Sequence, residues 1–161
     1  MPSEWIVDPA SIDFNQRIFS KQDVLEYCKQ RGSFELVDAV SLFEGPDERD
    51  IIVGYKDLAG EDWWANDHIP GRPIFPGVLM VEACGQLCTF HYLKSRDGDS
   101  NVFIGYGGLD NTRFRGIVEP PTRFVMAGKV KRARSKMFVY FAQGFADNRM
   151  VFETDIIGVI I

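Results

Sequence analysis

This chain has few cysteines, no long apolar run and no recognisable leader segment. Each of these features excludes a class of protein. The sequence has 3 cysteines in 161 residues, an odd number that does not fit a complete disulfide framework. No stretch reaches the ~18 apolar residues of a membrane helix. The first residues lack the basic start and apolar run of a signal peptide. We therefore expect a soluble protein without a membrane span, in a reducing compartment such as the cytoplasm.

Basic residues are also outnumbered. The 18 Lys and Arg side chains face 23 Asp and Glu, a net charge of −5, which disfavours nucleic acid as a partner. The charge is unevenly spread, because residues 113–136 carry eight basic side chains and one acidic one. That segment has a charge of +7 and leaves −12 for the remainder.

The length and patterning favour one domain of the α+β class. A chain of 161 residues, 45% of them apolar, buries enough surface to fold without disulfide or metal support. We expect residues 1–19 to form an arm over a single domain, residues 20–161. Ser20, with Asp23 three positions later, predicts a helix start, and Gly32 is a plausible stop. The alternating segments predict strands at 34–43, 50–58, 102–109, 111–118, 122–134, 137–146 and 149–160.

One helix is expected to be buried on all sides. Residues 78–93 are apolar almost all round, interrupted mainly by Glu82, Gln86 and His91. A surface helix would show a polar face. The sequence therefore predicts a long antiparallel sheet of six or seven strands curled around one central helix.

The chemistry concentrates just before and within this helix. Three prolines in residues 70–76 restrict the loop that carries His68. Gly77 falls at the helix N-terminus, where a free backbone N–H can bind an oxygen that gains negative charge. Glu82 follows in the second turn, where burying a carboxylate requires a partner or a function. An imidazole, a carboxyl group and an oxyanion donor are the components of acid–base catalysis near neutral pH.

These residues resemble the signature of the β-hydroxyacyl-acyl carrier protein dehydratases, in particular the FabZ type. The resemblance rests on His68-Ile69-Pro70-Gly71-Arg72-Pro73, Phe75-Pro76-Gly77-Val78-Leu79, Glu82-Ala83 and Gln86. It extends to an early segment with Arg31, Phe34, Leu36, Val37 and Asp38, and to residues 103–114. One departure is Lys29-Gln30, which stands where the family has Pro-His.

The resemblance implies a hotdog fold, in which a sheet wraps a long helix. It implies homodimers with sheets joined edge to edge, some assembled as three dimers, and an active site at the dimer interface. The implied reaction removes water from a (3R)-hydroxyacyl thioester on acyl carrier protein, in fatty acid biosynthesis and without a cofactor, to give the trans-2-enoyl thioester. His68 of one subunit would face Glu82 of the other.

The resemblance also implies residue roles. His68 would remove the C2 proton, since an imidazole titrates near neutrality. The Gly77 N–H would bind the thioester oxygen, and Glu82 would orient or protonate the departing hydroxyl. The Ile74 carbonyl would hold the other nitrogen of His68. Gln86 would support Glu82 or a water, or else join the helix to the sheet.

Further residues are candidates for contacts with substrate and carrier. Trp64, Phe75 and Tyr106, with Trp63, would line an acyl tunnel, unless they serve ordinary core or dimer packing. Acyl carrier proteins are acidic, and complementary charge speeds encounter. The candidate docking residues, which would otherwise form a solvated strand face, are Arg113, Arg115, Arg132, Arg134 and Lys136.

Other interpretations stay open. Cys84, Cys88 and His91 follow a spacing that could suggest a metal, but buried thiols favour plain packing, and we expect no metal site. The chain could also be a hotdog thioesterase, which would use a helix carboxylate and a water. A third possibility is a non-catalytic acyl-binding protein of the same shape.

Overall fold

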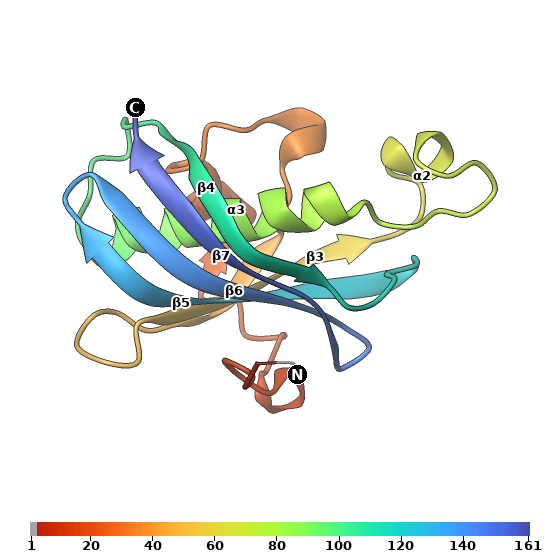
Figure 1. The fold of residues 1–161 in the computed structure, drawn as a ribbon, viewed down its shortest axis with the longest axis horizontal. Coiled ribbons are helices and arrows are strands. Elements are labelled where there is room, and N and C mark those ends of the chain that lie inside the picture. Colours follow the sequence, from red (N-terminus) through yellow and green to blue (C-terminus); the bar gives the residue numbers. More distant parts are fainter. Residues whose placement is uncertain (1–2) are drawn as a thin grey trace.

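Seven strands form one antiparallel sheet in the computed structural model, which describes residues 3–161. The strands are β1 (Phe19–Ser20), β2 (Ala39–Phe43), β3 (Ile51–Leu58), β4 (Ile104–Phe114), β5 (Thr122–Arg134), β6 (Met137–Ala146) and β7 (Arg149–Ile160). Their order is β1-β2-β3-β5-β6-β7-β4. The strand that follows the long helix in the chain, β4, therefore lies at one edge of the sheet (Figure 1).

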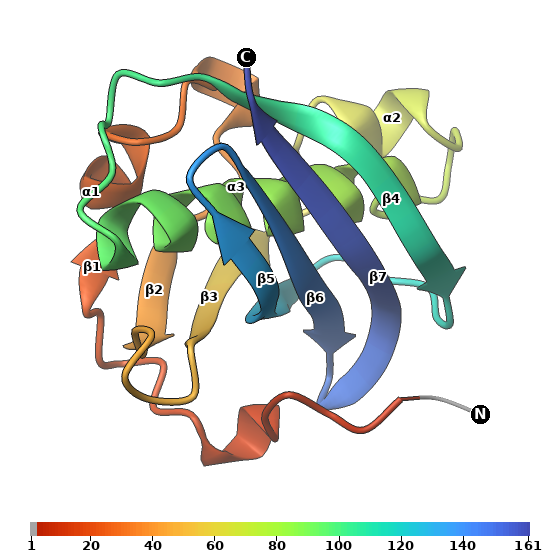
Figure 2. The same ribbon diagram turned by 60° about the vertical axis from the view of Figure 1, so that its left-hand side comes forward.

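The long helix α3 (Gly77–Ser95) lies inside the curve of the sheet, as the sequence predicts (Figures 1 and 2). It contacts β3, β5, β6 and β7. Residues on every side of it are buried, including Gln86 and His91. The missing polar face is explained by this enclosure, because most of the helix is buried and Val78, in its first turn, is the strongly exposed exception. The predicted α+β architecture, a sheet wrapped around one helix, is confirmed.

The segment between β1 and β2 differs from the prediction in its end points. Ser20 and Asp23 form the expected capping box, but α1 (Lys21–Leu25) ends well before Gly32. Gly32 has a φ of 66° and begins a 3-10 turn, Gly32–Phe34. The strand predicted from residue 34 consequently starts only at Ala39.

The two strands predicted at 102–109 and 111–118 are one strand, and that prediction was wrong. β4 runs through this region, with register shifts against β7 between Tyr106 and Gly108 and between Asp110 and Arg113. Asn111 takes a φ of 53° within the second shift. Glycines and an Asp-Asn pair indicate a turn in the sequence, whereas here they form β-bulges that bend a continuous strand. The short helix α2 (Trp64–Asp67) also lies in a segment expected to be loop.

The N-terminal arm covers the outer face of the sheet, opposite α3 (Figure 1). Val7 is buried in a second apolar cluster with Val53, Tyr55 and Phe145, which lies apart from the core around α3. The fully buried Gln143 fixes the arm, because its amide accepts from the Ile6 N–H at 2.8 Å and donates to the Glu4 carbonyl at 3.1 Å. The central strands are therefore buried on both faces. The boundary between arm and domain at residue 20 stays a prediction.

Candidate active site

His68 lies exposed directly after α2, on the loop that leads into α3. Its backbone N–H donates to the Trp64 carbonyl at 2.9 Å. Its Nδ1 lies 2.9 Å from the Ile74 carbonyl oxygen, the contact that the resemblance implies. Because a carbonyl oxygen can only accept, Nδ1 carries a proton, and in the neutral ring Nε2 keeps its lone pair. The imidazole is thus oriented to act as a base through Nε2.

The loop around His68 is held at several points. The Phe75 N–H donates to the Val118 carbonyl at 2.9 Å, which ties the loop to the segment after β4. Arg72 donates from Nε to Glu119 at 2.8 Å across the same gap. Gly71 takes a φ of 81°, a left-handed conformation that favours glycine. The structure therefore presents His68 on a restrained loop, in agreement with the proline pattern.

Gly77 is the first residue of α3, where the leading N–H groups have no acceptor within the helix. The positive end of the helix macrodipole lies at the same place. The ring of Phe114, from the end of β4, packs against Gly77. A Cβ added there would lie 2.7 Å from the ring, so the position has no space for a side chain. The helix start is thus closely flanked by the edge strand.

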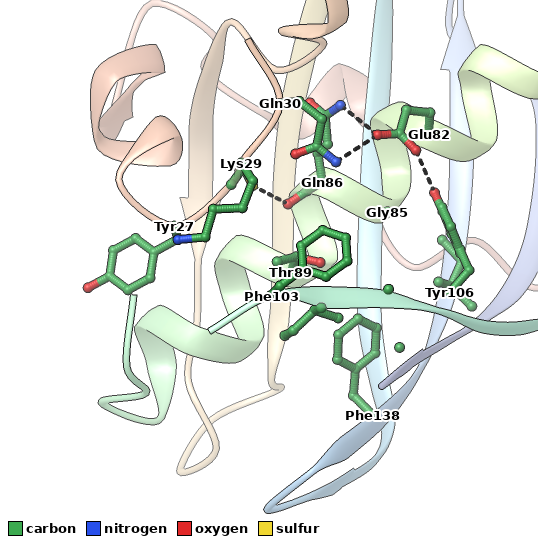
Figure 3. A pocket seen from close by; sticks show the side chains of 15 residues that line it. Tyr27, Lys29, Gln30, Glu82, Gly85, Gln86, Thr89, Phe103, Tyr106 and Phe138 are labelled. Carbon is green, nitrogen blue, oxygen red and sulfur yellow. Dashed lines mark hydrogen bonds between the residues drawn. The ribbon is translucent and has the colours of Figure 1, made fainter. Parts of the chain in front are cut away.

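Three neutral donors surround the Glu82 carboxyl group (Figure 3). Gln30 Nε2 and Gln86 Nε2 donate to Oε1 at 2.9 and 3.0 Å. The Tyr106 hydroxyl lies 3.3 Å from Oε2. The carboxyl group is consequently fixed by amide and hydroxyl groups, with no ion pair to it within the part of the chain that the structure describes.

Gln86 contacts Glu82, as one of its two predicted roles requires, while its other bonds go to the chain before β2 and not to a strand of the sheet. It is 4% exposed, and besides Glu82 it bonds the chain before β2: its Oε1 accepts from the Leu36 N–H at 3.1 Å, and its Nε2 donates to the Phe34 carbonyl at 2.8 Å. Gln30 is a site residue that sequence reasoning missed. The available signal was its position in the segment similar to the family, where it replaces a histidine.

Glu82 opens on a narrow pocket between α3, β4, β7 and residues 27–30. Its volume is about 30 Å³, space for about two waters. Tyr106 and Gln86 line it, whereas His68 does not. Within one chain, then, the structure does not bring the imidazole and the Glu82 carboxyl group into one pocket.

The predicted tunnel residues take different positions. Trp64 and Phe75 are 2% and 1% exposed and belong to the main core, with ring centroids 5.2 Å apart. Trp63 is half exposed and stacks on Phe34. Of this group, Tyr106 is the one that lines the pocket beside Glu82. Contact of any of them with an acyl chain stays a prediction.

The predicted docking residues lie at two ends of the sheet. Arg113 and Arg115 lie at the end of β4, where Arg115 pairs with Glu153 at 2.7 Å. The others flank the β5–β6 turn, and the Lys136 carbonyl accepts from the Ile160 N–H, beside the start of β4. Because β4 spans roughly 30 Å, the five residues do not form one patch on a single chain. All five residues, Arg113, Arg115, Arg132, Arg134 and Lys136, are exposed.

The cysteines and His91 are part of the core packing. Burial raises the pKa of the Cys28 thiol to about 12, with the nearby Glu82 charge adding to the shift. His91 contacts the Tyr140 hydroxyl at 2.6 Å and the Glu44 carbonyl at 2.8 Å. Across residues 3–161, no three His, Cys, Asp or Glu side chains are grouped as metal ligands would be. None of the described helices combines the length and the apolar character needed to cross a bilayer.

Solved structures with a similar fold include a dehydratase and a thioesterase. The ApeI:P dehydratase heterocomplex from Xenorhabdus doucetiae matches with a TM-score of 0.73 at 9% identity, over 90% of this chain and 93% of that one. A mutant of the thioesterase PA1618 from Pseudomonas aeruginosa matches at 0.56 and 10% identity, over 76% and 81%. At such low identity these matches establish the hotdog fold and nothing finer.

Sequence relatives carry the assignment further. A 3-hydroxyacyl-[acyl-carrier-protein] dehydratase FabZ from Campylobacter jejuni is 27% identical over 141 residues, 86% of this chain and 94% of its own. The FabZ from Nitrosospira multiformis is 29% identical over 136 residues, 83% and 91% of the two chains. The family model for the FabA-like domain matches residues 29–155, which contain His68, Gly77 and Glu82. This chain therefore belongs to the FabA-like family.

Proposed function

We propose that this protein dehydrates (3R)-hydroxyacyl-acyl carrier protein to the trans-2-enoyl form in fatty acid biosynthesis. The observation that carries the proposal is the orientation of His68, whose Nδ1 is engaged by the Ile74 carbonyl while Nε2 is left as a base. Membership of the FabA-like family and the similarity to FabZ dehydratases support the same reaction.

The proposed step is an elimination across C2 and C3. Nε2 of His68 takes the C2 proton, and the electron pair forms the C2–C3 double bond as the C3–O bond breaks. The Gly77 N–H donates to the thioester oxygen while negative charge develops on it. Glu82 gives a proton to the departing hydroxyl, which leaves as water. His68 has then gained the C2 proton and Glu82 has lost a proton to the water, and a net proton transfer from His68 to Glu82 restores both groups between turnovers.

A second copy of the chain would complete this site. The β4 edge exposes backbone hydrogen-bonding groups, which an equivalent strand can pair with. Phe103, Leu109, Phe114 and Ile117, on or beside that strand, are all more than 40% exposed, an unusual density of apolar side chains on a surface. Pairing of two β4 edges would bring His68 of one chain toward Glu82 of the other. We propose a homodimer, with a trimer of dimers as the larger form.

Such a dimer would also join the separated basic residues. A two-fold axis pairs antiparallel strands, so the end of one β4 lies beside the start of the other. Arg113 and Arg115 of one chain would then approach the β5–β6 turn of its partner, with Arg132, Arg134 and Lys136. We propose this joint surface as the docking site for acyl carrier protein, whose acidic surface complements it.

The function is tested by mixing purified protein with (3R)-hydroxyacyl carrier substrates and following the absorbance of the conjugated enoyl product. The expected result is turnover by the native chain and loss of at least 100-fold in His68→Ala. An unchanged rate in His68→Ala would contradict the mechanism. Release of free thiol would point to a thioesterase, and binding without turnover to a non-catalytic acyl-binding protein.

A further inference from the structure

The hydroxyl of Tyr106 contacts two acceptors on α3, and Figure 3 shows one of them, the Glu82 carboxyl group. The residue comes from the edge strand β4 and is 46% exposed, but its hydroxyl end points inward. The oxygen lies 3.0 Å from the Val81 carbonyl oxygen and 3.3 Å from Glu82 Oε2. A ring on the surface of the subunit thus reaches the carboxyl group assigned to proton transfer.

The helix makes room for this hydroxyl. Gly85 lies one turn beyond Val81, and a Cβ at that position would lie 2.2 Å from the Tyr106 oxygen. Glycine in a helix interior destabilises the helix relative to alanine, and no positive φ requires glycine here. The close approach of the Tyr106 hydroxyl accounts for the residue.

The two acceptors compete for one proton. A tyrosine hydroxyl donates one hydrogen bond and can accept others, whereas a backbone carbonyl only accepts. When Glu82 is ionised, the hydroxyl must choose between Oε2 and the Val81 carbonyl. When Glu82 is protonated at Oε2, the same hydroxyl can accept from it and donate to Val81. The arrangement therefore satisfies one more hydrogen bond with protonated Glu82 than with ionised Glu82.

The hydroxyl keeps its own proton throughout. Burial, and then the negative charge of Glu82, raise the pKa of Tyr106 well above its usual range. The other titratable side chains lining the pocket are Tyr27, Cys28 and Lys29. Burial raises the pKa of Cys28 to about 12, so this thiol also stays neutral near pH 7.

We propose that Tyr106 is a positioning residue for Glu82. The Tyr106 hydroxyl turns between Glu82 Oε2 and the Val81 carbonyl as Glu82 loses and regains its proton. The role in turnover rests on the proposed function, because there Glu82 must give up a proton and recover it in every cycle. The hydrogen-bond exchange itself is a property of the protein alone and is measurable without substrate.

The kinetic test compares Tyr106→Phe with Tyr92→Phe. The control removes a hydroxyl that bonds the Arg134 carbonyl, at the far end of the same helix. We expect Tyr106→Phe to lower kcat about 10-fold with KM within about 2-fold, because one hydrogen bond to the reacting carboxyl group is lost. Because the Tyr106 hydroxyl contacts Glu82 Oε2, the pH profile of kcat should also shift in Tyr106→Phe. Tyr92→Phe should keep the native profile.

The substrate-free test follows the carboxyl resonance of Glu82 against pH by NMR of protein labelled with 13C-glutamate, assigned with Glu82→Gln. The pH of its transition should change in Tyr106→Phe and stay unchanged in Tyr92→Phe. If Tyr106→Phe does not fold, Gly85→Ala displaces the hydroxyl sterically and should give the same shift. An unchanged transition in the folded variant overturns the role of Tyr106. Failure of the native protein to dehydrate any substrate overturns the proposed function instead, and the NMR result still decides the role of Tyr106.

Discussion

His68 and Glu82 obtain their geometry from different kinds of neighbour. A backbone carbonyl fixes the imidazole, and this contact was anticipated by the resemblance to the family. The Glu82 carboxyl group is held by side chains from three separate segments, Gln30, Gln86 and Tyr106. Only Gln86 of these was predicted to support Glu82. Gln30 and Tyr106 lie 52 and 24 residues away, and no local pattern indicates a contact across such distances.

Gln30 offers a direct test of this three-donor arrangement. Gln30→Ala should lower kcat about 3- to 10-fold, because Oε1 of Glu82 loses one of its two amide donors, a bond worth ~1 kcal/mol. The control is Gln22→Ala, an exposed glutamine of α1 outside the pocket. Steady-state dehydration rates and melting temperatures would separate an effect on the reaction from an effect on stability. Equal rates for both variants would show that Gln30 does not serve the reaction.

His91 should make stability depend on pH. Burial lowers its pKa, partly opposed by the hydrogen bond to the Glu44 carbonyl and by the charge of Asp50, so the unfolded chain binds the proton more readily than the folded one. Above the pKa of histidine in the unfolded chain, near 6.5, His91 is neutral in both states and costs no stability. As the pH falls below that pKa, the unfolded chain takes up the proton first and the free energy of unfolding decreases. Unfolding by urea at pH 7 and pH 5 measures the loss. In His91→Gln the difference in unfolding free energy between pH 7 and pH 5 should shrink. An unchanged difference would show that other groups cause the pH dependence.

At the scale of elements, the predictions succeeded where one physical cause dominated the pattern. α3 was predicted because an apolar surface on every side requires enclosure, and its end points agree within two residues. β4 was predicted as two strands separated at Asp110, whereas it runs through this position as one strand with register shifts against β7. The burial of both faces of β3 was not anticipated, since it depends on an arm that shows no clear period of its own.

The N-terminal arm should contribute measurably to stability. A chain that begins at Asp13 loses Ile6, Val7 and Ile12 from the outer cluster, and each buried aliphatic side chain is worth ~1.5–3 kcal/mol. We expect the melting temperature to fall by about 10 °C or more for a domain of this size. Substitution of the exposed Glu4 side chain by alanine is the control, because Gln143 bonds its backbone carbonyl rather than its side chain. A melting temperature equal to that of the full chain would show that the arm adds little.

At the scale of the whole molecule, the sequence predicted the fold, but the proposed site requires a second chain. The motif from His68 to Gln86 is continuous in sequence, yet its imidazole and its Glu82 carboxyl group do not share a pocket in one subunit. The basic segment likewise divides between two ends of the sheet. Both features are explained if the β4 edges of two copies pair, which is a property of the assembly and not of any local pattern.

The most direct test mixes two inactive chains. His68→Ala and Glu82→Gln are each expected to lose dehydratase activity, because each dimer then lacks the same group in both sites. When the two variants are co-expressed, mixed dimers should contain one site with His68 and Glu82 intact, and dehydration of (3R)-hydroxyacyl carrier substrate should reappear at about a quarter of the native rate, assuming random pairing of the subunits. If the native protein is active and the purified mixed dimer is not, the shared site is contradicted.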